Sequence, residues 1–392
     1  MIRINCVICN GNEFSENFKT KSTLMMVSDD RKMDENELFD LQFVACTHCG
    51  CVQLQKLYDP IVIYSQPLQC YNGPTLKTHY ELFSTFILDH ISDTNHILEI
   101  GGSYGRLAKI ISETKEIGQD RIESYRIMEV VSEQYPPIPN IEYISGNCET
   151  FDYRSFPIDT MIMSHVFEHL YEPRTFLKKI RDANIQHIFL SNPDMENLAK
   201  TGDINNLNIL HTYYIDTRYL TYLFNEYGYV LENTSNYENN SVFYHFMLDS
   251  RPDVRSIVPY KNPELPDYTL NFYRNLQSSI HDIQISTPFF ICPSGFYGKF
   301  VYNYLHENTR RFVLGFLDSD PMKIGKRLSG TPCQIYPKNT IQSHDDDMLR
   351  DGNEPDQLSD RKDVLIVSEK HKKELMDELY SINANITFHF LT

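Results

Sequence analysis

The chain has 392 residues, enough for two or three domains, and 41% of them are hydrophobic, an ordinary share for globular proteins. Its 36 basic and 53 acidic residues give a net charge of −17, which repels phosphate backbones and excludes non-specific nucleic-acid binding. No apolar run approaches the roughly 20 residues that span a bilayer, and the first residues lack a signal peptide's apolar core. We therefore expect a cytoplasmic protein with no membrane partner, whose nine cysteines are thiols or metal ligands.

Two Cys-x-x-Cys pairs lie near the N-terminus. Each pair can place two thiolates on one metal from a tight turn, and two such pairs complete the tetrahedral sulfur site that Zn²⁺ favours. The predicted ligands of this structural zinc are Cys6, Cys9, Cys46 and Cys49. The long gap between the pairs predicts an inserted loop or hairpin. His48 and Cys51 are less favoured substitutes, and two unrelated thiol pairs are the alternative.

The segment 58–80 contains three prolines and a glycine, and is either a linker or a loop that closes over a site. If it closes, Tyr71 is a candidate to face a ligand. A helix is expected over 81–92, where apolar residues recur on one side.

A short apolar strand, 97–100, runs directly into a glycine turn and then into a helical pattern from residue 106. A strand, glycine turn and helix in this order form a ligand-binding loop, because glycines let the backbone approach and the helix N-terminus offers free N–H groups. The glycines are Gly101, Gly102 and Gly105. Their spacing differs from the dinucleotide fingerprint. Glu99, just before them, suits a ligand with a cationic part, such as S-adenosylmethionine (SAM). A purely structural glycine turn is the alternative.

Further strands alternate with helices after this turn. The strand 125–131 contains Glu129, and an acidic residue at this place commonly binds two ribose hydroxyls. After the strand 141–145, Asn147 stands where an adenine ring would lie. Strands at 159–163 and 188–190 follow. This alternation predicts an α/β fold with a doubly wound parallel sheet and ligands at the carboxyl ends of its strands.

The run from His165 to His169 matches the H-x-x-E-H metal pattern. We expect no such metal site, because the two histidines of that pattern need the middle of a helix and these follow a strand. We predict instead that His169 lies in the binding crevice, with a buried core histidine as the alternative, and that His165 lies beside the cofactor. His211 is predicted on a loop at the same end of the sheet, where it can act as a general base.

The second half of the chain contains another α/β pattern. Residues 250–268 hold four prolines and are expected to connect two domains, and the acidic stretch 344–363 is expected to be a surface loop. The remaining predicted elements are a helix at 217–227, a strand at 242–247, a helix at 269–283, a strand at 288–291, a helix at 300–307, a strand at 312–317, a strand at 364–367 and a helix at 369–380.

With these motifs, the chain resembles the SAM-dependent sugar C-methyltransferases of deoxysugar biosynthesis over nearly its whole length. The resemblance lies in the four cysteines, in LEIGGSYGRLA and SHVFEHLYEP, and in SGFYGKFVYNYL and GFLDSDPMKIGKRLSGTPCQI. It implies three domains: a zinc-binding N-terminal domain (1–75), a Rossmann-like methyltransferase domain (76–250) and a second Rossmann-like domain (251–392). Gly101, Gly105 and Glu129 would then bind the cofactor.

The same resemblance implies that His169 and His211 lie at the reacting sugar. Family members often carry a Tyr and a Glu just before the second histidine, where this chain has Asn208 and Leu210. The sequence therefore predicts no obvious carboxylate partner for His211.

Our leading hypothesis is C-methylation of a nucleotide-linked 4-ketosugar, with His211 as the base and His169 or Tyr71 as the donor to the enolate oxygen. Methylation of a sugar hydroxyl or amine is the alternative. A third hypothesis is an inactive nucleotide-sugar-binding protein. We expect a monomer or homodimer.

Overall fold

A computed structural model describes residues 1–23, 27–29, 38–64, 74–91, 96–114, 122–195, 197, 208–237, 241–249, 261–262, 264–342, 362–368 and 372–391. The chain forms two compact units. The first comprises Met1–Thr20 and Leu41–Leu270, and the second Lys21–Asp40 and Asn271–Thr392. The domain boundaries predicted at 75/76 and 250/251 stay predictions, since residues 65–73 and 250–260 lie outside the described ones. No helix in the described ranges combines the length and apolarity needed to cross a bilayer.

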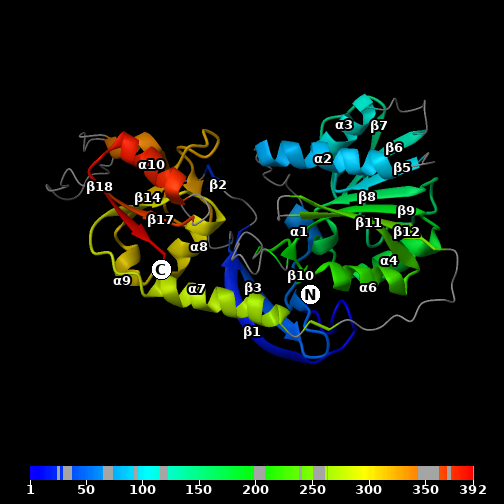
Figure 1. Cartoon of the computed structure of the whole chain (residues 1–392), viewed down its shortest axis with the longest axis horizontal. Coiled ribbons are helices and arrows are strands. Elements are labelled where there is room, and N and C mark those ends of the chain that lie inside the picture. The colour runs from blue at the N-terminus through cyan, green and yellow to red at the C-terminus, as the bar shows by residue number, and fades with distance from the viewer. Residues whose placement is uncertain are drawn as a thin grey trace. The chain divides into compact units, whose positions relative to one another are not determined.

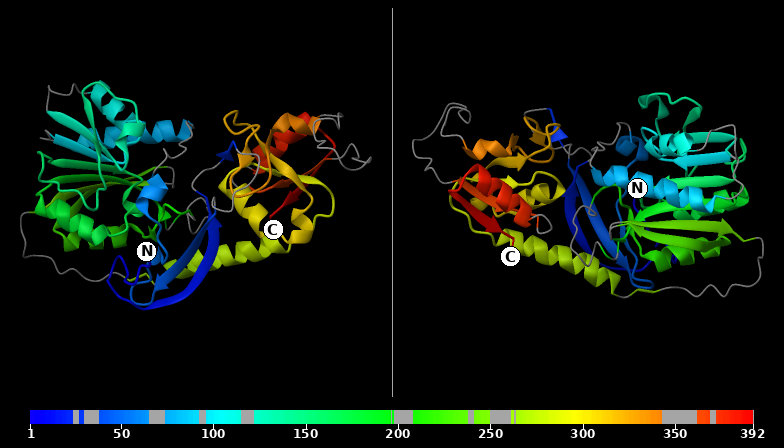
Figure 2. Two further views of the ribbon diagram at one scale, coloured as in Figure 1. Left: turned by 180° about the vertical axis from the view of Figure 1, so that it is seen from behind. Right: turned by 45° about the horizontal axis from the view of Figure 1, so that its top comes forward.

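The cysteine-bearing part forms a four-stranded sheet in the order β1-β3-β4-β10 (its strands from the N-terminal part of the chain are blue in Figure 2). Its last strand comes from far along the chain, and it pairs antiparallel with β4. A short helix, α1 (Pro60–Tyr64), follows the sheet's first three strands. The strands are β1 (Phe14–Ser22), β3 (Phe39–Cys46), β4 (Val52–Leu54) and β10 (Tyr213–Tyr214).

A seven-stranded sheet forms the core of the first unit, in the order β11-β12-β9-β8-β5-β6-β7. The five strands from β7 to β9 are parallel, whereas β12 pairs antiparallel with β9 and with β11. The strands are β5 (His96–Ile100), β6 (Ser124–Glu129), β7 (Ile141–Ser145), β8 (Thr160–Ser164), β9 (His187–Pro193), β11 (Tyr229–Tyr237) and β12 (Ser241–Leu248).

Helices cover both faces of this sheet (Figure 1). On β8, Met161 and Met163 pack into one apolar cluster and Ile162 into the other, because successive side chains of a strand point to opposite faces. Apolar residues on both faces need cover on both, and the predicted doubly wound α/β fold is confirmed. One face carries α2 (Pro74–His90) and α3 (Arg106–Thr114), and the other α4 (Pro173–Asp182) and α6 (Thr217–Glu226).

The second unit contains a five-stranded parallel sheet in the order β16-β14-β13-β17-β18. A second, Rossmann-like α/β domain is therefore present, as predicted. Of the predicted acidic loop, residues 344–361 lie outside the described ones. The strands are β13 (Phe289–Cys292), β14 (Val313–Asp318), β16 (Ile335–Pro337), β17 (Lys362–Ile366) and β18 (Ile386–Phe390), and the helices α7 (Phe272–His281), α8 (Phe296–Tyr304), α9 (Glu307–Arg310) and α10 (Lys372–Ile382).

A small two-stranded sheet completes the second unit. It pairs β2 (Val27–Ser28) antiparallel with β15 (Arg327–Leu328). The remaining short elements are the 3₁₀ helices η2 (Ser132–Gln134), η3 (Phe167–His169) and η6 (Lys338–Gln342), and the π-helical turn η5 (Asp267–Asn271).

Candidate functional site

Four cysteine sulfur atoms converge, two from each of the predicted pairs. Cys6 Sγ lies 3.6 Å from Cys49 Sγ, and Cys9 Sγ lies 3.5 Å from Cys46 Sγ. All four atoms lie within 4.8 Å of one another. Thiolates bound to one tetrahedral zinc at about 2.3 Å stand roughly 3.8 Å apart. The donor set and its spacing therefore fit the predicted structural zinc.

Each cysteine pair lies on a turn that closes with a residue in the left-handed conformation. Asn10 (φ +59°) follows the first pair and Gly50 (φ +83°) the second, and each donates its backbone N–H to the carbonyl oxygen of the first cysteine of its pair. Glycine and asparagine adopt this conformation most readily. A Cβ on Gly50 would also lie 2.0 Å from Asn262 O. His48 and Cys51, the less favoured ligands, lie outside the four-sulfur group.

The glycine turn after β5 is folded as predicted, and a Cβ at any of its three glycines would clash with a neighbouring side chain. Gly101 has a φ of +71° and Gly105 a φ of +62°. A Cβ on Gly105 would lie 2.2 Å from Ile138 Cδ1, and a Cβ on Gly102 would lie 2.8 Å from Glu99 Cδ. A Cβ on Gly101 would lie 2.6 Å from Val166 Cγ2, so all three glycines allow close packing at the turn.

A cavity of about 330 Å³ opens at the carboxyl ends of β5, β6 and β8, where ligands of open α/β sheets bind. It brings together residues that the sequence predicted from four separate segments. Those that line it are Gly101, Glu129, Asn147, His165 and His169. The predicted residues that are absent from its wall are Glu99, Gly102, Gly105 and His211. Tyr71 lies outside the described residues.

Glu129 is held on the cavity wall by the glycine turn. Its Oε1 accepts a hydrogen bond of 2.5 Å from the backbone N–H of Ser103, which also lines the cavity. Burial raises the pKa of the Glu129 carboxyl to about 7. The carboxylate therefore has a fixed orientation and stays protonatable near neutral pH.

Glu99 lies under the turn instead of on the cavity wall. Its side chain is 2% exposed, and its Oε2 accepts a 2.8 Å hydrogen bond from the Tyr125 hydroxyl. Burial raises the pKa of Glu99 to about 7. Its predicted contact with the cationic part of a ligand stays a prediction.

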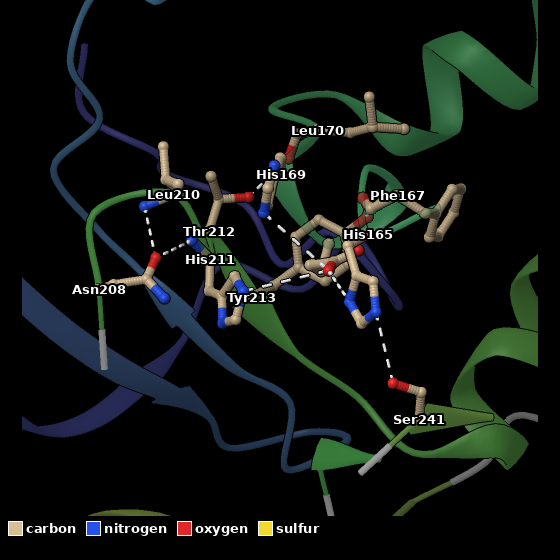
Figure 3. A network of polar contacts seen from close by, with 11 residues as sticks. His165, Phe167, His169, Leu170, Asn208, Leu210, His211, Thr212, Tyr213 and Ser241 are labelled. Carbon is tan, nitrogen blue, oxygen red and sulfur yellow. Dashed lines mark hydrogen bonds and ion pairs between the residues drawn. The ribbon is translucent and has the colours of Figure 1, made fainter. Parts of the chain in front are cut away.

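Three histidines, His165, His169 and His211, lie close together (Figure 3), and the buried carboxylate of Glu168 lies within 4.0 Å of a ring nitrogen of each. Glu168 Oε1 lies 3.5 Å from His165 Nδ1, 3.9 Å from His169 Nε2 and 4.0 Å from His211 Nε2. The Glu168 side chain is 1% exposed, and neither of its oxygens has a hydrogen-bond partner among the described residues. Burial opposes ionisation, but the neighbouring imidazoles outweigh it and lower the pKa of Glu168 to about 2.

Backbone and side-chain hydrogen bonds fix the His211 segment against η3. The backbone N–H of Thr212 donates to Glu168 O at 3.0 Å, and its hydroxyl donates to Leu170 O at 2.6 Å. The Tyr213 hydroxyl donates to Phe167 O. These hydrogen bonds hold the segment after His211 against the η3 turn, which places His211 beside Glu168.

A carboxylate does lie near His211, although the sequence predicted no obvious one, because Glu168 Oε1 is 4.0 Å from His211 Nε2. Leu210 does replace the expected glutamate, but Glu168 supplies a carboxylate from η3. Asn208 has its own role, because its Oδ1 accepts hydrogen bonds from the backbone N–H groups of Leu210 (2.8 Å) and His211 (3.0 Å). It shapes the turn that carries the histidine.

As predicted, the H-x-x-E-H run follows a strand and does not lie in the middle of a helix. It continues from the end of β8 through His165, which has a φ of +54°, into the single turn η3. Sequence reasoning missed Glu168, although it stands inside this run. The pattern itself was the available signal, since it places two histidines and a glutamate within five residues.

Comparisons with known proteins find similarity only in structure. No family model matches the chain, and no curated protein is detectably similar to it. The PH0226 protein from Pyrococcus horikoshii OT3 is 10% identical, with a TM-score of 0.35 over 45% of this chain and 93% of that one. Magnesium protoporphyrin IX methyltransferase from Synechocystis PCC 6803, with bound S-adenosylhomocysteine (SAH), is also 10% identical, with a TM-score of 0.35 over 45% and 84%.

The N-methyltransferase NodS from Bradyrhizobium japonicum WM9, in complex with SAH, is 10% identical, with a TM-score of 0.34 over 46% of this chain and 90% of that one. Similarities at this level establish neither the activity nor the substrate of this chain.

Proposed function

We propose that this chain is a SAM-dependent methyltransferase. The observation that carries the proposal is one cavity with the Glu129 carboxylate on its wall and the Glu168 cluster at its edge. Numbered in chain order from β5 as strand 1 to β12 as strand 7, the seven strands have the sheet order 3-2-1-4-5-7-6. Strand 7 is antiparallel to its neighbours. The six-stranded dinucleotide-binding order is 3-2-1-4-5-6. The reversed strand matches the class I methyltransferase core that the sequence motifs resemble.

The cavity residues suit a nucleoside cofactor. A volume of about 330 Å³ lies within the usual range of small-molecule sites. Glu129 offers a carboxylate at the end of the second strand, where ribose hydroxyls are commonly bound. Asn147 follows β7 and is proposed to lie beside the adenine, while Gly101 lets the chain pass close to the ligand. SAM, when bound, supplies an electrophilic methyl group on a sulfonium sulfur.

The acceptor is proposed to be a nucleotide-linked deoxysugar, as the sequence motifs imply. Methylation next to a keto group and methylation of a hydroxyl both require loss of a proton and stabilisation of a negative oxygen. The Glu168 cluster supports both reactions, because its imidazoles offer nitrogen donors and acceptors at the edge of the cavity. C-methylation remains the favoured reaction and O- or N-methylation the alternative.

The four-sulfur group is proposed to hold a structural zinc, with no free position for a substrate. A cytoplasmic location and a monomeric or homodimeric state remain predictions.

The cofactor site is tested by calorimetric titration with SAH. We expect binding to the wild-type chain, and at least about tenfold weaker binding to Glu129→Ala, since the carboxylate and its hydrogen bonds to ribose are lost. Glu133→Ala is the matched control, because Glu133 is an exposed carboxylate just after β6 that is absent from the cavity wall. No SAH binding by the wild-type chain would contradict the proposal and favour an inactive binder.

The acceptor is tested with nucleotide-linked sugars in D₂O. Deuterium entering the carbon next to a keto group before methyl transfer supports the carbon route, since only that route makes a carbanion. Methyl transfer from labelled SAM without this exchange supports the hydroxyl route. His211→Ala is expected to abolish turnover with either acceptor while SAH affinity is kept.

A further inference from the structure

Three imidazole nitrogens lie 3.5, 3.9 and 4.0 Å from the buried Glu168 carboxylate. No described group donates a hydrogen bond to either of its oxygens, and its side chain is 1% exposed. An ionised carboxylate removed from water is strongly unfavourable unless it is hydrogen-bonded, paired with a cation or bound to a metal. The imidazoles around the carboxylate indicate where a further group would bind.

Two of these imidazoles converge on one carboxylate oxygen without reaching it. His169 Nε2 and His211 Nε2 lie 3.9 and 4.0 Å from Glu168 Oε1, and all three atoms lie within 4.8 Å of one another. Hydrogen bonds between such atoms span about 2.7–3.2 Å, so these separations are too long for a direct hydrogen bond. An ion bonded tetrahedrally at about 2.0–2.1 Å to each atom would hold these atoms about 3.3–3.4 Å apart, so each carboxylate–imidazole separation would shorten by about 0.6 Å.

We propose that Glu168, His169 and His211 bind a divalent transition-metal ion. Two imidazoles and one carboxylate suit Zn²⁺, Co²⁺, Mn²⁺ or Fe²⁺, whereas Mg²⁺ prefers oxygen ligands alone. The hydrogen bond from Thr212 N to Glu168 O joins the two ligand-bearing segments without an ion. The proposed site is separate from the cysteine group and differs from it in chemistry.

The ion would be reachable from the cavity, since His169 lies on its wall. Three protein ligands leave at least one coordination position for a substrate, as in catalytic metal sites. If the proposed methyltransferase function holds, an oxygen of the acceptor occupies that position, and the ion stabilises its negative charge. His169 and His211 would then act as ligands through Nε2, in place of the predicted donor and base.

The test is a cobalt titration of metal-free protein followed by absorption spectroscopy. Cobalt bound to four thiolates gives an intense sulfur-to-metal charge-transfer band, and cobalt bound to imidazole and carboxylate gives only weak visible bands. We expect two ions per wild-type chain, one of each kind. Glu168→Gln and His211→Ala should weaken the weak-band site by about 100-fold or more, since direct ligands matter more than their outer partners.

Two further variants serve as matched controls. His96→Ala removes a histidine from the amino end of β5, at the opposite edge of the sheet, and should keep both ions. Cys46→Ser should weaken the charge-transfer band, because it removes one of four thiolates, and should keep the weak bands. Retention of the charge-transfer band by Glu168→Gln and His211→Ala shows that these variants are folded. A wild-type chain that binds only the thiolate-bound ion overturns the proposal, as does a Glu168→Gln variant that still binds two ions.

The same samples, titrated with SAH, separate this proposal from the proposed function. Two ions without SAH binding would support the metal site and contradict the methyltransferase. SAH binding with one ion would overturn the metal site and leave the methyltransferase in place, with His211 again the expected base.

Discussion

Glu99 offers a test of how a buried carboxyl responds to pH. Burial raises its folded-state pKa from 4.5 to about 7, so the folded chain holds a proton that the unfolded chain releases. This group should therefore add to the free energy of unfolding as pH falls from about 7 to about 4.5, by roughly 3 kcal/mol at most. Denaturant unfolding of Glu99→Gln between pH 5 and pH 8 should lack this pH-dependent contribution. At pH 8 the free energy of unfolding of the variant should exceed that of the wild type.

The amide of Glu99→Gln can still accept the Tyr125 hydroxyl hydrogen bond, so packing is kept. Glu113→Gln, at an exposed position on α3, is the control and should keep the wild-type pH dependence. Equal pH slopes in wild type and Glu99→Gln would contradict this account.

Single residues were predictable where their chemistry depends on the local sequence. The four cysteines are examples, because a Cys-x-x-Cys turn is a local motif. Glu129 is another, since its place follows from the end of one strand. The carboxylate near His211 was not predictable, because Glu168 lies on a segment about 40 residues away in the sequence. The residues next to His211 in the sequence do not indicate a contact with a distant segment.

Gly105 tests what the turn after β5 requires. An alanine there would have a positive φ and would place its Cβ 2.2 Å from Ile138 Cδ1. Backbone strain and overpacking together should lower the free energy of unfolding by about 2–4 kcal/mol. The measurement is denaturant unfolding of Gly105→Ala, alone and combined with Ile138→Val, which removes the clashing atom and should restore part of the loss.

Gly325→Ala is the matched control, because Gly325 also has a positive φ (+82°) but a Cβ there would contact nothing within 4 Å. It should cost only about 1 kcal/mol, the strain alone. Equal losses at the two glycines would show that packing against Ile138 is unimportant.

Many strands and helices were predictable from apolar patterns, whereas β1, β16, β18 and α4 were not among the predicted elements. The strand predicted at 141–145 matches β7, and the helix predicted at 217–227 matches α6 within a residue. β11 was missed because its residues 232–236 are all polar, and it lies at the sheet edge with only β12 as a neighbour. Helix α8 begins four residues before the prediction, since Gly295 is its N-cap.

Removal of the zinc ligands should affect the whole first unit. Cysteines of the four-sulfur group belong to the same apolar cluster as Leu98 and Met161 of the seven-stranded sheet. Cys46→Ser should lower bound zinc by one equivalent and lower the unfolding temperature, because metal binding contributes several kilocalories per mole to folding. Elemental analysis and thermal unfolding measure both effects. Cys333→Ser in the second unit is the control, and unchanged zinc in Cys46→Ser would exclude the site.

The second unit is assembled from two separate stretches of chain, and this limits how it can be isolated. Residues 21–40 supply β2, which pairs with β15, and Thr23, whose hydroxyl accepts a hydrogen bond from the buried ammonium group of Lys299. A fragment excised at residue 271 would leave both interactions behind. Expression of the second unit on its own therefore requires the 21–40 peptide, either co-expressed or grafted onto the fragment. After proteolytic cleavage between the two units, this peptide should stay bound to the second unit.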